Sequence, residues 1–250
     1  RGYGIYPHGD RSGCGESESM MKITYLGHSG FLAETDDAYF LFDYYKGTMP
    51  ELDGSKKMLV FVSHGHYDHY SKSVYGLRSV FKEIYYILSW DVPAGTEEVH
   101  PIRPGEETVI AGCRVRALRS NVEGVAFLVC YNGKTLYHAG DLNWWHWEGE
   151  PEEYNTGMRR SYQSEINKLQ GVKIDAAFVP VDPRLGEQYC WGIDCFMKRT
   201  DTNYVFPMHF WGSYDVYDRL MLEPCTRDYR DRIMKIEQEG QSYLLDSLEK

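Results

Sequence analysis

Four side chains that can bind a metal ion occur within six residues of this 250-residue sequence: His64, His66, Asp68 and His69. Imidazole nitrogens and carboxylate oxygens are the usual protein ligands of zinc, iron(II) and manganese. The apolar run 60–63 leads straight into the cluster, so a strand end followed by a loop can converge these side chains on one point. A lone histidine is usually a surface or core residue, but this density predicts a site for one or two divalent metal ions.

The spacing resembles the metallo-β-lactamase superfamily, whose H-x-H-x-D-H signature this cluster matches at every specified position. Residues 24–31 resemble the opening strand of the lactonase-like branch of that superfamily. Residues 41–43 resemble its next strand, in which Asp43 would support the metal loop. Two later segments, 137–141 and 206–210, resemble its G-D and P-x-H motifs. The resemblance implies an α+β fold, a four-layer αββα sandwich.

The same resemblance implies a ligand set. His64 and His66 would hold a first metal ion, while Asp68, His69 and His209 would hold a second. Asp141 would bridge the two ions. The metal, which is Zn, Mn or Fe by its ligand chemistry, would activate a water molecule and polarise the substrate, and Asp68 either binds the metal or orients that water. Asp68, His69 and Asp141 are therefore the predicted catalytic residues.

One ligand of the family pattern is missing. The superfamily usually supplies a third histidine to the first metal from the region that corresponds here to residues 118–124, which contains none. Glu123 could supply an oxygen ligand, Ser120 and Asn121 could bind a water molecule, or the segment is a plain polar turn. A site that lacks this histidine should bind metal more weakly or favour Mn or Fe over Zn.

Five residues are candidates for substrate contact. Trp144, Trp145 and His146 follow Asp141 directly, and aromatic rings often form pocket walls. These tryptophans could equally pack in the core or in an oligomer interface. Arg184 could clamp an anionic substrate or pair with an acid such as Asp182. His28 follows the first predicted strand and either faces the site or is a structural turn residue.

Short β-branched and aromatic runs alternate with a few helical patterns. The expected strands are 23–26, 30–35, 39–42, 58–63, 84–88, 108–111, 114–118, 125–131, 135–138 and 174–181. The expected helices are 73–81, 158–169, 194–199 and 227–238. Frequent strands in both halves favour two packed sheets with outer helices over a parallel doubly wound sheet.

Composition limits the partners. A formal net charge of −10 disfavours a nucleic-acid partner, and no apolar run reaches the length of a membrane span. Six scattered cysteines are expected to be free thiols in a reducing compartment, so we expect a cytoplasmic protein. Residues 1–19 are expected to be an upstream extension or an expression remnant, and residues 20–250 a single domain that could assemble as a homo-oligomer.

The sequence therefore predicts a metal-dependent hydrolase that acts on a small-molecule ester, lactone, amide or phosphodiester. The alternative, which the missing histidine motivates, is a catalytically weak protein that binds a metal or senses a ligand on the same fold.

Overall fold

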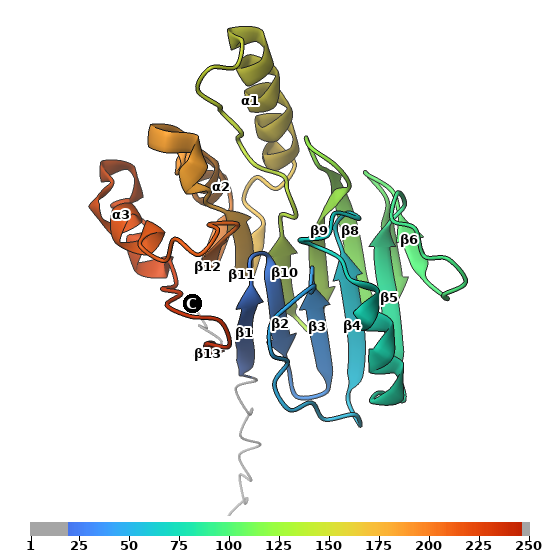
Figure 1. The fold of residues 1–250 in the computed structure, drawn as a ribbon. Coiled ribbons are helices and arrows are strands. Elements are labelled where there is room, and N and C mark those ends of the chain that lie inside the picture. The colour runs from blue at the N-terminus through green and yellow to red at the C-terminus, as the bar shows by residue number, and fades with distance from the viewer. Residues whose placement is uncertain (1–19, 247–250) are drawn as a thin grey trace, which may run out of the picture.

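The computed structural model describes residues 20–246, and the prediction for residues 1–19 lies outside this range. Thirteen strands form two sheets within the described residues, and the sheets face each other (Figure 1). The first sheet has the order β13-β1-β2-β3-β4-β5-β6 and the second the order β12-β11-β10-β9-β8-β7. The predicted α+β sandwich of two sheets is confirmed.

The strand bounds follow the β-branched and aromatic runs closely. The first sheet contains β1 (Met21–Gly27), β2 (Gly30–Glu34), β3 (Ala38–Phe42), β4 (Lys57–Val62), β5 (Ile84–Ser89), β6 (His100–Ile102) and β13 (Ser242–Leu245). The second contains β7 (Glu107–Ile110), β8 (Cys113–Arg119), β9 (Val125–Tyr131), β10 (Lys134–His138), β11 (Lys173–Pro180) and β12 (Asp201–Met208). The three strands β6, β12 and β13 were not among the expected strands.

Strand direction decides where the loops meet. Strands β3, β4 and β5 are parallel, and β1 runs the same way because it pairs antiparallel with β2, which pairs antiparallel with β3. In the second sheet β10, β11 and β12 are parallel. The carboxyl ends of parallel strands lie at one edge of a sheet, so the segments that follow these strands are grouped.

The core lies between the sheets and under the helices α1 (Glu152–Asn167), α2 (Trp191–Arg199) and α3 (Val216–Leu222), each of which contributes buried apolar side chains to it. The helix α2 contacts β11, β12 and α1. On the outer face of the first sheet, a second apolar cluster is covered by η1 (Lys72–Ser79) and loops. This covering element is a 3-10 helix in place of the expected α-helix at 73–81.

The prediction of a helix over 227–238 is wrong. The structure has two short 3-10 helices nearby, η3 (Pro224–Thr226) and η4 (Arg230–Arg232), and the chain then becomes extended. Ile233 forms a parallel bridge to Val205 of β12, and the Met234 amide donates to the Val205 carbonyl oxygen. Hydrogen bonding to the edge of the sheet therefore outweighs the local helical pattern.

The remaining helix predictions were displaced at their ends only. The helix expected at 158–169 begins six residues earlier, at Glu152, and the helix expected at 194–199 begins at Trp191. The five cysteines within the described residues are free thiols, as expected, and Cys14 lies outside this range. None of the helices described for residues 20–246 combines the length and the apolar character needed to cross a bilayer.

Candidate metal centre

The carboxyl ends of the parallel strands deliver the predicted ligands to one place. His64 comes two residues after β4, Asp141 three residues after β10, and His209 directly after β12. These segments are far apart in the sequence, yet Asp141 contacts histidines from two of them. The structure therefore brings the three family-like motifs together, as the sequence predicted.

Asp141 lies at the middle of the cluster. Its Oδ2 is 3.1 Å from Nε2 of His64, and its Oδ1 is 3.1 Å from Nε2 of His69 and 3.3 Å from Nε2 of His209. Asp141 is buried, and so are these three histidines. A carboxylate with one oxygen toward each side of the cluster has the position that a bridging ligand needs.

Three of these buried atoms make no well-aligned hydrogen bond within the described residues, although both Nε2 atoms lie 3.1 Å from a carboxylate oxygen of Asp141: Nε2 of His64, Nε2 of His69 and Oδ1 of Asp141. An unpaired buried polar atom costs about 1–3 kcal/mol, so three that converge on one point are not expected without a compensating ligand. Histidine Nε2 and carboxylate oxygen are suitable ligands for Zn, Mn or Fe. The donor set therefore fits a divalent cation.

The Nδ1 atoms of His64 and His69 form hydrogen bonds on the side of each ring that faces away from Asp141. His69 Nδ1 lies 2.7 Å from Asp43 Oδ2, and Ser63 Oγ lies 2.9 Å from His64 Nδ1 and donates to Asp43 Oδ2 at 2.5 Å. The Ser63 amide also donates to Asp43. The predicted supporting role of Asp43 is confirmed, and the effect is to direct both Nε2 atoms toward Asp141.

Asp182 does the same for His209, and the sequence reasoning missed this role. Its Oδ2 lies 2.9 Å from His209 Nδ1, and the wholly buried carboxylate also accepts from the Arg184 guanidinium and the Trp211 indole N–H. Arg184 is therefore paired with Asp182, one of the two options that the sequence left open. The available signal was an Asp-Pro-Arg segment at the end of a buried strand.

His28 lies inside the cluster. Its Nε2 is 3.1 Å from Asp68 Oδ2, and its ring centroid is 4.3 Å from that of His209. His28, Asp68, His69 and His209 each offer a ligand atom within 4.8 Å of the others. The sequence predicted that His28 either faces the site as a substrate contact or is a structural turn residue, whereas the structure places it among the possible metal ligands.

Protonation reflects this crowding. Burial lowers the pKa of the His69 imidazole, but the Asp141 and Asp43 carboxylates raise this pKa by more, so that it is about 10. Burial raises the pKa of Asp68, but the hydrogen bond from His28 and the charge of His69 bring it down to about 2. The pKa of Asp141 is well below its usual value, against burial, because three histidines face it. The carboxylates are charged at neutral pH.

The side chains at the mouth of the centre are half exposed, whereas those in its interior are buried. His66 Nε2 lies 3.0 Å from Glu123 Oε2, and the two side chains are 50% and 54% exposed. His64, His66 and Asp68 each offer a ligand atom within 4.8 Å of the others, so His66 faces the first predicted metal position. Glu123 comes from the segment that lacks the expected histidine.

The other two candidates in that segment are engaged elsewhere. Asn121 donates to the backbone oxygens of Asn143 and Met158, and Ser120 Oγ accepts from the Val122 amide. Of Glu123, Ser120 and Asn121, Glu123 is the residue whose side chain pairs with a predicted ligand, His66.

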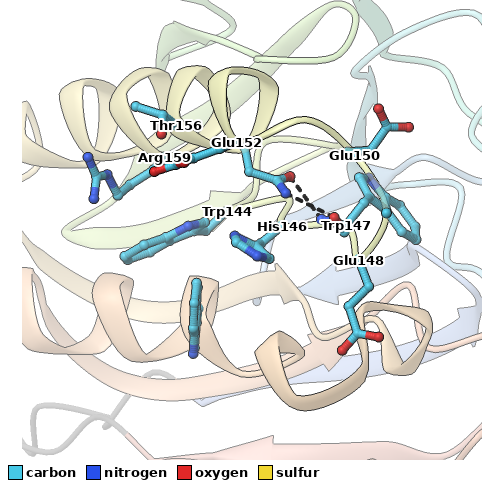
Figure 2. Close-up of a pocket in the computed structure, with 11 residues that line it drawn as sticks. Trp144, His146, Trp147, Glu148, Glu150, Glu152, Thr156 and Arg159 are labelled. Carbon is cyan, nitrogen blue, oxygen red and sulfur yellow. Dashed lines mark hydrogen bonds between the residues drawn. The ribbon is translucent and has the colours of Figure 1, made fainter.

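The tryptophans divide into two groups. Trp145 is buried, donates its indole N–H to the Asp141 carbonyl oxygen, and has its ring 5.4 Å from that of His209. Trp147 stacks on Trp145 with the rings 5.8 Å apart and nearly parallel. Trp144 and His146 line a cavity together with Trp147 (Figure 2). Trp145 is thus a wall of the metal centre, and Trp144 is not.

Comparison with known protein families gives a match to the beta-lactamase superfamily domain over residues 22–148. This range includes the histidine cluster and Asp141. A "UPF0173 metal-dependent hydrolase" of Desulforamulus reducens is 28% identical over 213 residues, which cover 76% of this chain and 84% of the relative.

Two solved structures are similar in fold. A metallo hydrolase of the archaeon Ignicoccus hospitalis has a TM-score of 0.63 at 17% identity, with 91% of this chain and 99% of that chain covered. A diiron beta-hydroxylase of Streptomyces venezuelae has a TM-score of 0.59 at 12% identity, with 92% of this chain and 54% of that chain covered. Since these neighbours differ in chemistry, the function must be argued from the site.

Proposed function

The chain belongs to the metallo-beta-lactamase superfamily, and from that premise we propose a metal-dependent hydrolase that cleaves a small-molecule ester, lactone, amide or phosphodiester. The observation that carries the proposal is the convergence of three buried ligand atoms from His64, His69 and Asp141, none of which makes a well-aligned hydrogen bond within the described residues. Four further side chains support it from around this centre: His28, His66, Asp68 and His209. We propose Zn, Mn or Fe as the metal, in one or two positions.

In this proposal, His64 and His66 would hold one ion, Asp68, His69 and His209 would hold the other, and Asp141 would be shared between the two positions. The chemistry that a divalent ion would supply in these positions is a water molecule of lowered pKa and polarisation of the scissile bond. Asp68 is a carboxylate at neutral pH because its pKa is about 2, so it can accept a hydrogen bond from the attacking water.

The surroundings of the centre support a small substrate. Arg184, half exposed, lies between the rings of Trp147 and Trp211, with distances of 5.4 and 4.8 Å to the ring centroids. Its guanidinium is fixed by Asp182, and its remaining N–H groups can donate to an anionic substrate group.

A cytoplasmic location, the single domain over 20–250 and a possible homo-oligomer remain parts of the proposal.

The test combines metal analysis with turnover. The purified chain is stripped, reloaded with Zn, Mn or Fe, and assayed on a lactone, a carboxylic ester, an amide and a phosphodiester. We expect one to two bound ions and turnover that the Asp141→Ala variant loses, while the His100→Ala variant retains both, because exposed His100 lies on β6 away from the centre. A chain that binds no metal contradicts the proposal, and so does unchanged turnover of the Asp141→Ala variant.

The second candidate function is a metal-binding or ligand-sensing protein with little turnover. The half-exposed pair of His66 and Glu123, which stands where the first metal position would have a third histidine, favours it. Metal binding without turnover of any substrate class in the same assay would support this candidate over the hydrolase.

A further inference from the structure

Two cysteines and a glutamate meet where the start of α2 packs against the end of α3, two helices that lie next to each other (Figure 1). Cys190 directly precedes α2, Glu223 directly follows α3, and Cys225 lies in η3. The two Sγ atoms and a carboxylate oxygen of Glu223 all lie within 4.8 Å of one another. The tertiary structure thus gathers two sulfur donors and one oxygen donor away from the Asp141 centre.

Glu223 is held in place beside the cysteines. The Tyr189 hydroxyl donates to Glu223 Oε1 at 2.9 Å, and the Arg219 guanidinium of α3 lies 4.0 Å from the centroid of the Tyr189 ring. The Thr226 hydroxyl donates to the Glu223 carbonyl oxygen at 3.1 Å, which fixes the turn after α3. Among residues 20–246, the Glu223 carboxylate accepts a hydrogen bond only from Tyr189, so its second oxygen is available to a ligand.

The surroundings of the three donors favour a cation. Cys190 is buried, whereas Glu223 and Cys225 are half-buried, so an ion and a water molecule can reach the group from solvent. A second carboxylate, that of Asp194, is close enough for its charge to act on both thiols. Lys198 is ion-paired with this carboxylate at 2.9 Å and neutralises one of the negative charges. Two thiolates and the Glu223 carboxylate would still leave an excess of negative charge for a cation to offset.

The donor types select the kind of cation. Thiolate sulfur is a soft ligand that favours zinc and similar ions, whereas the centre around Asp141 offers imidazole and carboxylate. Two sulfur atoms that bind one tetrahedral zinc ion at about 2.3 Å are about 3.8 Å apart. The spacing of the Cys190 and Cys225 donors is compatible with this value after shifts of about 1 Å or less.

We propose that Cys190, Cys225 and Glu223 form a second, separate metal site that binds one thiophilic divalent cation such as zinc. A water molecule would take the fourth position, and each thiol would release its proton to solvent on binding. The bound ion would tie the start of α2 to the end of α3. This inference goes beyond the proposed function, because it concerns neither the Asp141 centre nor hydrolysis.

The test uses cadmium(II) as the probe, because thiolate ligands give this ion an ultraviolet charge-transfer absorption band that imidazole and carboxylate ligands do not give. The reduced, metal-free protein is titrated with cadmium(II) under anaerobic conditions. We expect a saturable charge-transfer band. The groups of possible ligands around Asp141 contain only histidine and aspartate within residues 20–246, so that centre adds nothing to the band. Absence of the band overturns the inference.

Four variants locate the ion. Cys190→Ser and Cys225→Ser are each expected to reduce the band by about half or more, because each removes one of two sulfur ligands. Glu223→Gln keeps both thiols and is expected to weaken cadmium binding by at least about tenfold. Cys195→Ser is the matched control, since Cys195 lies in the same helix and is 5% exposed, against 4% for Cys190. An undiminished band in the Cys190 and Cys225 variants, or an equal loss in the control, overturns the location.

Thermal unfolding in the Asp141→Ala background separates the two metal sites. Cadmium is expected to raise the unfolding midpoint of this variant, because an ion that binds only the folded chain stabilises it. Adding Cys225→Ser should reduce this rise, and an equal rise in both proteins contradicts the tie between α2 and α3. A band without turnover would refute the hydrolase and leave this site standing. Turnover without a band would refute this site and leave the hydrolase standing.

Discussion

The buried Asp182 carboxylate lies 2.9 Å from Nδ1 of His209, so the ring that faces Asp141 on one side is held from the other. The same carboxylate binds Arg184, whose guanidinium lies over the rings of Trp147 and Trp211. Asp182 therefore connects a predicted metal ligand with a predicted substrate contact. Carboxylates that hold metal-binding histidines in this way commonly affect metal affinity by one to two orders of magnitude.

The Asp182→Asn variant tests this connection. The amide keeps the size of the side chain but removes the charge, so we expect metal affinity to fall by about 10–100-fold, as measured by competition with a chelator. The Asp175→Asn variant is the matched control, because Asp175 is near the start of the same strand, β11, and among residues 20–246 accepts a hydrogen bond only from the Thr135 amide. Equal affinities of the two variants would contradict the role of Asp182.

The Glu123→Gln variant tests whether Glu123 serves the first metal position. We expect the more weakly bound ion to lose at least about tenfold in affinity, because the amide is a poorer ligand than the carboxylate. The readout is the stoichiometry and affinity in a metal titration. Glu107→Gln is the control, since Glu107 has the same exposed fraction, 54%, and also pairs with a neighbouring side chain. An unchanged titration of Glu123→Gln would assign the residue to the polar turn alone.

Metal binding should depend steeply on pH. His69 has a pKa of about 10 when only protein groups face it, so its imidazole carries a proton at neutral pH, which a metal ion must displace. Affinity is therefore expected to rise by about tenfold per pH unit between pH 7 and 9, as competition with one proton requires. Calorimetry in buffers of different ionisation enthalpy measures the released proton. An affinity that stays flat over this range would show that His69 binds no metal.

Protonation of His69 also affects the free energy of unfolding. Because the folded pKa of His69 lies above its unfolded value, the protonated ring stabilises the fold fully below about pH 6.5, and this stabilisation is lost as pH rises toward 10. Urea unfolding of the chelator-treated protein should therefore show a free energy of unfolding that falls over this range. The His69→Gln variant should lack this part of the fall, and an identical fall in the variant would refute the assignment.

The Gly124→Ala variant tests how the loop after β8 holds the histidine cluster. Gly124 has a φ of +74°, and an added Cβ would lie 1.8 Å from the Ser63 carbonyl oxygen and 2.8 Å from His64 Cβ. Gly133→Ala is the control, with φ of +75° and no neighbour within 4 Å, so it should cost only about 1 kcal/mol for the left-handed backbone. We expect a larger loss of stability and weaker metal binding in Gly124→Ala alone, by thermal unfolding and metal titration. If the two variants lost stability and metal affinity equally, the contact with Ser63 would not be the cause.

The sequence by itself predicted most of the described strands and most of the proposed metal-ligand set. The strands follow from short β-branched and aromatic runs, a local property of the chain. The proposed ligands His64, His66, Asp68 and His69 lie close together in one loop, so their chemistry and spacing could be recognised without the fold. The positions of Asp141 and His209 came from the resemblance to a family, since neither residue is distinctive alone.

The tertiary structure decided what depends on segments that are distant in the sequence. It places Asp182 behind His209 and Glu123 beside His66, and it separates Trp145 at the metal centre from Trp144 at the cavity. It also replaces the expected helix at 227–238 by an extended segment on the edge of β12. Hydrogen bonds and packing between remote elements set these outcomes, and such interactions leave no periodic signal in the sequence.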